Sequence, residues 1–376
     1  MPQYAAQASE LGVSINAAYK AATLYYQQGL KGNEVTKISA QTLKMAKIAG
    51  LDAADATDKM TAALRGFNME MNEASAEKVA DVYSKLAAVT AADVDEISSA
   101  MSKTASIAAS AGMKFETTAA FLSQIIETTR ESAETAGTAM KTVIARFQEL
   151  KKDPAEIGEV DGEIIDANKI ETALRSVGVA LRDSSGQFRD LDDVFMELSS
   201  KWNTLDTNTQ RYIATMAAGS RQQSRFIAMM SDYNRTQELV TAANTSAGAS
   251  NQQFEKTMDS LEAKLEKLKV AWDTFTMDLM NSDLIKGAVD ILTSIITAIN
   301  NITNLLGEGS GLAKVMIIIG ALYLGDKALT VFRTSLNATD ESGKKVNGVL
   351  ASLGIVGKSA LTGTANAATK LSKGMS

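Results

Sequence analysis

Apolar residues recur through the first 150 residues at the spacing of an α-helix. Val79, Val82, Tyr83 and Leu86 fall on one face of a helix, and Ala, Ser and Thr dominate the opposite face of this and similar stretches. Small side chains allow neighbouring helices to approach closely. The pattern predicts amphipathic helices that pack tightly against one another.

Four helix starts stand out in this region, each with Gly or a small residue ahead of a Ser, Thr or Asp cap. In the third of them, Thr90 and Asp93 have the spacing of a capping box. The four starts are unevenly spaced, so they predict no internal repeat. They read LGVSINAAYKAA from Leu11, AGLDAADATDKM from Ala49, AAVTAADVDEIS from Ala87 and AGMKFETTAAFL from Ala111.

A break near residue 150 divides the pattern. Pro154 cannot continue a helix, and the polar, Gly-containing stretch from Ile157 to Asn168 is typical of a loop or an insertion. We expect one helical core subdomain over residues 1–150 and a second helical core subdomain over residues 151–245.

The second core subdomain holds the one candidate β-hairpin, near residues 177–189. Val177 to Leu181 favours a strand, Asp183 to Gly186 has the residues of a tight turn, and the next three residues complete a return strand. Helices are expected to follow, with Gly219-Ser220-Arg221 ending one before another begins. Their predicted bounds are Leu191–Trp202, Thr207–Ala218 and Gln222–Thr241.

The segment AANTSAGASNQQ, residues 242–253, is polar and rich in small residues, and it predicts a hinge or linker. Apolar residues then alternate steps of three and four from Met258 to Leu279, and again from Ile285 to Leu306. This spacing is typical of a coiled-coil seam, so coiled-coil-like helices are expected over residues 254–306.

Residues 312–376 predict a hydrophobic helix followed by a tail rich in small residues. The run from Val315 to Gly325 contains no charge, but it has about half of the roughly 20 residues that cross a bilayer. A buried core helix, a helix–helix contact in an oligomer and a re-entrant membrane segment all fit its length. Because the tail ends without a cap or a closing core element, we expect a fragment of a longer polypeptide.

Composition supports an all-α fold, because Pro2 and Pro154 are the only prolines and good helix formers recur throughout. The fold class predicted is a multi-helix core with one small β-hairpin, followed by long amphipathic or coiled-coil helices. The first ten residues lack a secretion signal, so synthesis and folding in the cytoplasm are expected.

Charge and residue usage exclude several classes of function. A formal net charge of -6 argues against a protein whose main function is to bind nucleic acid. No sequence-specific nucleic acid binding is expected. The absence of cysteine excludes disulfides and thiolate metal sites. The absence of histidine removes the commonest general base and metal ligand.

Few residues suggest catalysis. Glu127, Glu131 and Glu134 lie close enough to suggest a glycosidase pair, but on a helix this spacing usually marks a solvated face. Ser102 and Ser359 each adjoin a lysine that could replace a histidine base, although such pairs are common in this chain. The glycine-rich run from Gly307 lacks the ending of a phosphate-binding loop. We predict no enzyme and assign no catalytic, cofactor-binding or metal residue.

Six segments in this order resemble the conserved core of the tail tape measure protein family of long-tailed phages and related prophages. The resemblance spans about residues 8–240. The segments are ASELGVSINAAYKAATLYYQQGL, KVADVYSKLAAVTAADVDEISSAM, AGMKFETTAAFLSQIIE, TAGTAMKTVIARFQEL, VGVALRDSSGQFRDLDDVFMELSSKW and YIATMAAGSRQQSRFIAMM. At single positions, we expect Gly137 and Thr138 to permit close helix contact.

The resemblance implies a structural ruler and scaffold for assembly of the tail tube, with a role in DNA ejection. It implies contacts with tail tube proteins, tail assembly chaperones and tail tip proteins, and the seams suit a small homo-oligomer. The implied location is the lumen of the virion tail tube, after assembly in the host cytoplasm. Contact of Val315 to Gly325 with the host inner membrane during ejection is a further implication.

Two other classes of function remain as alternatives. A secreted, membrane-perturbing helical protein of the translocator or toxin type fits the small-residue helices and the apolar run. A tail-associated enzyme that cleaves the cell wall has only the scattered carboxylates in its favour.

Overall fold

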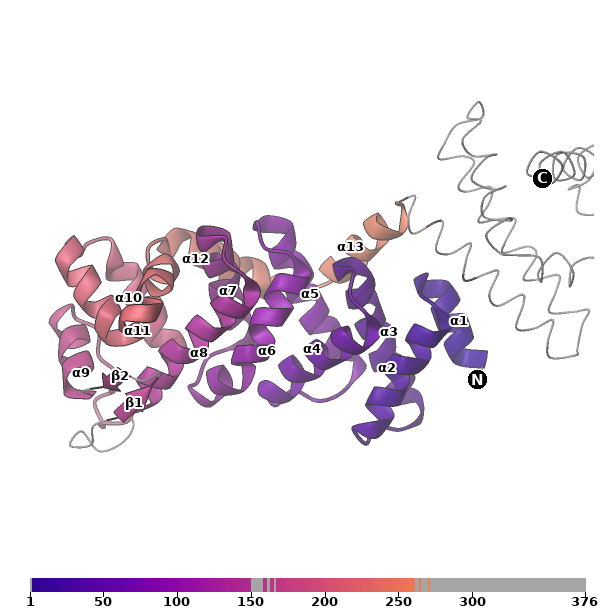
Figure 1. Cartoon of the computed structure of the whole chain (residues 1–376), viewed down its shortest axis with the longest axis horizontal. Helices are drawn as coiled ribbons and strands as arrows, with labels where there is room; N and C mark the ends of the chain where they lie inside the picture. The colour runs from indigo at the N-terminus through magenta and orange to yellow at the C-terminus, as the bar shows by residue number, and fades with distance from the viewer. Residues whose placement is uncertain are drawn as a thin grey trace, which may run out of the picture. The chain divides into compact units, whose positions relative to one another are not determined.

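The computed structural model describes residues 2–149, 158–160, 163–165, 167–260, 264 and 270, which belong to one compact unit, Met1–Thr274. The prediction of an all-α fold is confirmed for these residues (Figure 1). The seams beyond residue 260, the run from Val315 to Gly325, and Gly307 and Ser359 lie outside the described residues. The described helices are α1 (Pro2–Leu11), α2 (Ile15–Gln27), α3 (Gly32–Ala49), α4 (Ala53–Gly66), α5 (Glu73–Val89), α6 (Val94–Ser110), α7 (Phe115–Thr129), α8 (Ala133–Glu149), α9 (Ala167–Ser176), α10 (Leu191–Trp202), α11 (Thr207–Met230), α12 (Tyr233–Asn244) and α13 (Ala249–Met258).

The first eight helices form a stack of four helix pairs in two layers. Helices α2, α4, α6 and α8 follow one another in one layer, and α1, α3, α5 and α7 follow one another in the other. Each helix also contacts its partner in the pair. Since a pair buries its apolar faces mainly against the next pair, the arrangement is that of a helical repeat protein.

The repeat is visible at the caps of one layer. The side chains of Ser14, Asp52, Asp93 and Ser132 accept the backbone N–H groups that open α2, α4, α6 and α8. These caps lie about 40 residues apart, a spacing typical of helical repeats. The predicted helix starts do not show the repeat, because the fourth of them, at Ala111, precedes α7 in the other layer. The capping box also differs, because Asp93 pairs with Glu96 and Thr90 ends α5.

Ion pairs join neighbouring helices within both layers. In every case a lysine on one helix reaches an acidic residue at the N-terminal end of the next helix in its layer, where a negative charge is favoured by the helix dipole. Most of these side chains are exposed, so each pair adds little stability but helps to set the register of the stack. The pairs are Lys20–Asp52, Lys59–Asp95 and Lys103–Glu134 in one layer, and Lys37–Glu73 and Lys78–Glu116 in the other.

Helices α6 and α8 cross in close contact at Gly137. A Cβ atom at this position would lie 2.7 Å from the carbonyl oxygen of Ala100, which is too close. Because the two helices lie so close, the Thr104 hydroxyl of α6 donates a hydrogen bond to the Gly137 carbonyl oxygen of α8, at 3.2 Å. The predicted role of Gly137 is therefore confirmed, whereas Thr138 is exposed and takes no part.

Aromatic rings from α7, α8, α10 and α11 form the centre of the core at the far end of the stack. Phe195 lies 5.1 Å from Phe147, 6.2 Å from Phe121 and 6.4 Å from Phe226 between ring centroids, and Trp202 packs on Phe226. Edge-to-face contacts of this kind are favourable beyond the area that they bury. Residues from both sides of the break near residue 150 thus contribute to one core.

Two local predictions between residues 151 and 190 need correction. Strands β1 (Gly158–Val160) and β2 (Glu163–Ile165) pair antiparallel inside the stretch predicted to be a loop. The two residues between them in the sequence are Asp161 and Gly162, a pair typical of two-residue hairpin turns. At the predicted hairpin near residues 177–189, a single bridge between Arg182 and Phe188 replaces two strands.

The predicted turn at Asp183 is confirmed. The Asp183 carboxylate accepts the backbone N–H groups of Ser185 and Gln187 as well as the Ser185 hydroxyl, and Gly186 adopts a positive φ of 84°. Val179 donates its N–H to the Leu174 carbonyl and so closes the end of α9. The residues predicted as the first strand therefore begin as a helix cap.

Gly219 breaks α11, as expected, because its φ of 75° and ψ of 169° are not helical. The helix predicted over Gln222–Thr241 is wrong as one element. It ends at Met230, and Asp232 caps a new helix, α12, by accepting the N–H of Arg235. Ser231 and Asp232 are residues typical of the end of one helix and the cap of the next, a signal that apolar periodicity does not contain.

Candidate functional site

After the break at Gly219 the chain turns back along the stack. We call residues 220–258 the return strap; it comprises the second half of α11, then α12 and α13. The strap packs first on α7 and α8, then on α5 and α7, and finally on α3 and α5, so it runs towards the first helix pairs (Figure 1). The last helix of the strap, α13, therefore lies beside α3.

Two arginines of the strap bind the glutamates that suggested catalysis. The Arg225 guanidinium contacts both carboxylate oxygens of Glu131, with Nε–Oε2 at 2.6 Å and Nη2–Oε1 at 2.7 Å. Arg235 contacts Glu127 at 3.1 Å and also donates to the Val89 carbonyl oxygen. Glu134 pairs with Lys103. All three carboxylates thus join separate elements and do not form a common site, and two of them fix the strap.

Gln124 on α7 joins the strap from inside the core, where it is 1% exposed. Its amide nitrogen donates to the carbonyl oxygens of Ala228, Met229 and Asp232, which lie around the break between α11 and α12. Its oxygen accepts the hydroxyl of Thr236 at 2.5 Å. One buried amide therefore satisfies backbone groups that the helix break leaves free.

Asp81 on α5 holds the beginning of α13. Its carboxylate, buried at 5% exposure, accepts the N–H groups of Gly248 and Ser250, both at 2.8 Å, and the Ser250 hydroxyl. A carboxylate at a helix N-terminus is favoured by the free N–H groups and by the helix dipole. The segment predicted as a hinge or linker, residues 242–253, thus contains the end of α12, the connection over residues 245–248 and the start of α13. A residue far away in the sequence orders it.

Asn251 connects α13 to both helices beneath it. It accepts a hydrogen bond from Lys44 of α3 at 2.9 Å and donates to Glu77 of α5 at 3.3 Å. Asn251 directly follows Ser250, so these contacts lie beside the Asp81 cap. The last part of the strap is thus attached mainly by polar groups.

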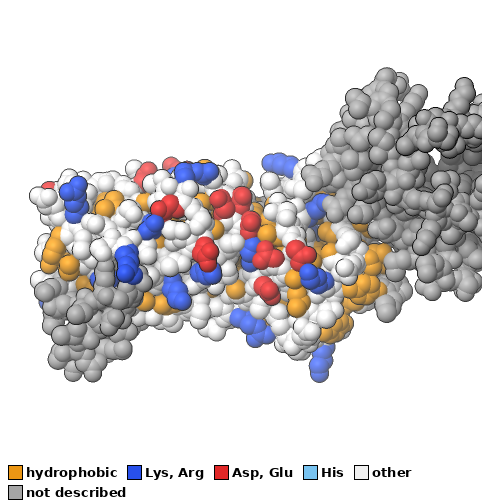
Figure 2. Space-filling view, in the orientation of Figure 1, with side chains coloured by type: hydrophobic (Ala, Val, Ile, Leu, Met, Phe, Trp, Pro, Cys, Tyr) orange, Lys and Arg blue, Asp and Glu red, His pale blue; other side chains and the backbone are white. Residues whose placement is uncertain are grey.

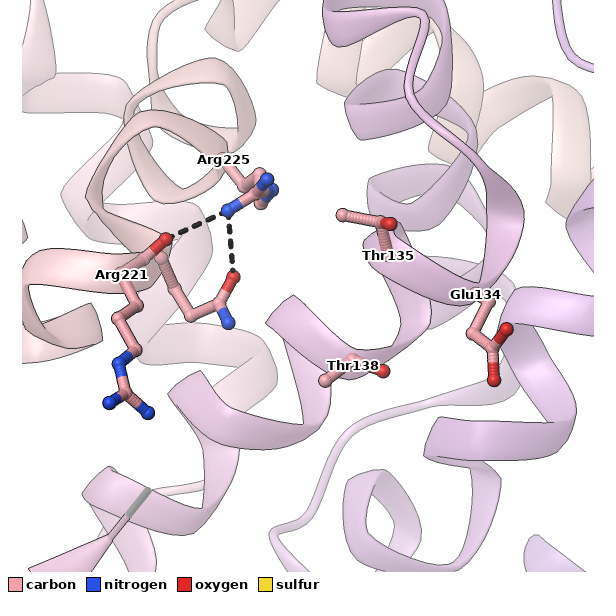
Figure 3. A pocket seen from close by; sticks show the side chains of 6 residues that line it. Glu134, Thr135, Thr138, Arg221 and Arg225 are labelled. Atoms are coloured by element: carbon pink, nitrogen blue, oxygen red, sulfur yellow. Dashed lines mark hydrogen bonds between the residues drawn. The ribbon is translucent and has the colours of Figure 1, made fainter. Parts of the chain in front are cut away.

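A shallow depression of about 260 Å³ lies where the strap meets α8, and Figure 3 shows the residues around it. Arg225 is turned towards the Arg221 carbonyl and the Gln222 side chain, to which it donates hydrogen bonds. Glu134 and Arg221 lie on opposite sides and do not converge on one point. The arrangement offers no set of groups aimed at a reacting atom.

The remaining candidates have ordinary structural surroundings. The Ser102 hydroxyl donates to the carbonyl oxygen of Ser99, and Lys103 is paired with Glu134. No three carboxylates within the described ranges come together as metal ligands. No helix among these residues is long and apolar enough to cross a membrane. Acidic and basic side chains are interspersed on the face drawn in Figure 2.

The chain is similar to proteins of phage tails. A family model described as phage-related minor tail protein matches residues 2–219. The tape measure protein of Pneumococcus phage Dp-1 is 23% identical over 295 residues, which are 78% of this chain and 24% of that protein. The probable tape measure protein of Escherichia phage P2 is 26% identical over 256 residues, which are 67% of this chain and 29% of that protein.

The chain spans about a quarter of the length of these curated relatives. No solved structure matches it. The family model covers more than half of the 376 residues, from the first helix to the break at Gly219, and so includes the whole stack of helix pairs. The chain belongs to the phage-related minor tail protein family.

Proposed function

We propose that this chain is the core part of a tail tape measure protein, a structural ruler and scaffold on which the tail tube assembles. The observation that carries the proposal is its alignment with the tape measure protein of phage Dp-1 over 78% of its residues. An interaction role also agrees with the site, where the glutamates are bound to arginines and the polar groups hold helices together.

The two parts of the chain suit different tasks. A continuous helix advances 1.5 Å per residue, so about 40 residues span roughly 60 Å. In a stack of helix pairs the same 40 residues advance by about 10 Å, the distance between packed helices. We propose that the stack serves as an anchoring module, while the seams predicted over residues 254–306 contribute to measured length.

We further propose that the chain acts without catalysis, inside the tail tube lumen, as a small homo-oligomer. Its proposed partners are tail tube proteins, tail assembly chaperones and tail tip proteins, and it would assemble in the host cytoplasm and take part in DNA ejection. Val315 to Gly325 would contact the host inner membrane during ejection. Support comes from the family, the heptad spacing of the seams and the absence of charge in that run.

The ruler proposal is tested by duplicating residues 258–306 in the phage gene and measuring tail lengths by electron microscopy. A helical ruler predicts tails longer by about 70 Å. The matched control duplicates one helix pair, α5 and α6 in residues 73–114, which should lengthen tails by no more than about 10 Å. Tails of unchanged length after duplication of residues 258–306 would contradict the ruler role of the seams.

Enzymatic activity is tested separately with the purified chain on isolated cell walls of the host. We expect no release of soluble fragments. Clearing of the walls that is lost in Glu127→Gln or Glu131→Gln would overturn the structural assignment.

A further inference from the structure

The apolar attachment of the return strap weakens from its beginning to its end. The second half of α11 buries Phe226, Met229 and Met230, and α12 buries Leu239 and Ala243. In α13, Ser250 is fully buried, Met258 is 8% exposed, and Phe254 packs against the core while remaining partly exposed. Since burial of apolar surface is the main stabilising contribution to packing, α13 is the least firmly held part of the strap.

The face of α5 that binds α13 also buries a polar group at a cost. Glu77, Asp81 and Ser84 are spaced four and three apart, so they share one face of α5. Glu77 and Asp81 both bind α13, but Ser84 is 1% exposed and its hydroxyl has no hydrogen-bond partner. A buried polar group without a partner opposes docking, because water would satisfy it once the surface opened.

The face of α3 that binds α13 also has a buried polar group without a partner. Lys44 of α3 binds Asn251. Gln41 lies three residues before Lys44, so the two residues share one face of α3. Gln41 is 5% exposed, and its side-chain oxygen has no partner. Of the five buried side-chain atoms without a hydrogen-bond partner in the described part of the chain, four belong to α3 and α5: Ser39 Oγ, Gln41 Oε1, Tyr83 Oη and Ser84 Oγ.

We infer that α13 is a releasable latch, docked through Asp81 and able to leave the α3–α5 surface while the rest of the strap stays in place. Its few apolar anchors, and the unpartnered Gln41 and Ser84 on the helix faces that bind it, make the docked state only slightly favourable. Asp81 supplies the specific contact, because it binds the first N–H groups of the helix and releases them together. Release of the latch would free α13 without unfolding the stack.

Hydrogen exchange of the whole chain, followed by mass spectrometry, tests the latch. In the unaltered protein, amides of residues 251–258 are expected to exchange at least tenfold faster than those of residues 226–230 and 237–243. Asp81→Asn replaces an acceptor oxygen by a donor amide, and it should accelerate exchange in α13 at least tenfold further with α12 unchanged. Equal protection of α13 and α12 in the unaltered protein would overturn the latch.

Two further variants separate release from general destabilisation. Asp192→Asn alters another buried aspartate, which accepts the Lys114 N–H at 3.2 Å, and it should leave the ratio of exchange rates between α13 and α12 unchanged. Ser84→Ala removes an unpartnered hydroxyl and should slow exchange in α13 several-fold. Faster exchange in α13 of Ser84→Ala, or equal acceleration of all helices in Asp81→Asn, would contradict the inference.

Discussion

Arg225 and Glu131 form a two-point ion pair across 94 residues of sequence, with both nitrogen–oxygen distances below 2.8 Å. The planar guanidinium matches the carboxylate in a geometry that lysine cannot reproduce. The pair ties the strap to the turn between α7 and α8. It also explains why a glutamate that resembled a catalytic residue has a structural role.

Replacing Arg225 by lysine should lower the free energy of unfolding by about 1 kcal/mol, because one of the two hydrogen bonds is lost in a partly exposed site. Urea unfolding followed by circular dichroism provides the measurement. In a double-mutant cycle with Glu131→Gln, the two losses should not add. If the two losses in the free energy of unfolding were additive, the interaction between Arg225 and Glu131 would contribute nothing to stability.

Replacing Gly137 by alanine should destabilise the protein by about 1–3 kcal/mol, because the new methyl group meets the backbone of Ala100 and forces α6 and α8 apart. The neighbouring exposed residue supplies the control, and Thr138→Ala should change stability by less than about 0.5 kcal/mol. Thermal unfolding of both variants compares them directly. A neutral Gly137→Ala would show that the crossing tolerates a wider separation.

Replacing Gln124 by methionine should cost about 2–3 kcal/mol, since the carbonyl groups around the α11–α12 break and the Thr236 hydroxyl would lose their buried partner. Gln148→Met, at a site where the amide bonds the exposed Ser110, serves as the matched control and should be nearly neutral. The two are compared by chemical unfolding. Similar losses in both variants would argue that hydrophobic substitution, and not the buried network, causes the effect.

Acid should weaken the contact between α10 and the turn before it. The hydrogen bond from Lys201, assisted by Arg189, holds the pKa of Glu197 below its ordinary value. A lowered pKa in the folded state stabilises the protein above the ordinary pKa, and this stability is lost as the pH falls through the folded value. Glu197→Gln should therefore reduce the free energy of unfolding at pH 7 by up to about 1 kcal/mol and have a smaller effect at pH 3. An equal loss at both pH values would contradict this origin.

The amino-acid sequence alone determined the elements whose causes are local. The predicted bounds of α10, Leu191–Trp202, agree with the structure, and the turn at Asp183 and the break at Gly219 are also as expected. In each case, side chains within a few residues provide the apolar face, the cap or the unusual backbone angle. The family could be recognised for the same reason, because it rests on the order of such local segments.

Only the tertiary structure decided which helices become neighbours and what the polar residues do. Whether residues 242–253 form a linker or a docked helix depends on Asp81, which lies more than 160 residues away and offers no local signal. The roles of Glu127 and Glu131 depend in the same way on arginines about 100 residues later. A hydrogen bond or ion pair of this kind forms only after the stack has brought its two ends together, so spacing along the chain carries no record of it.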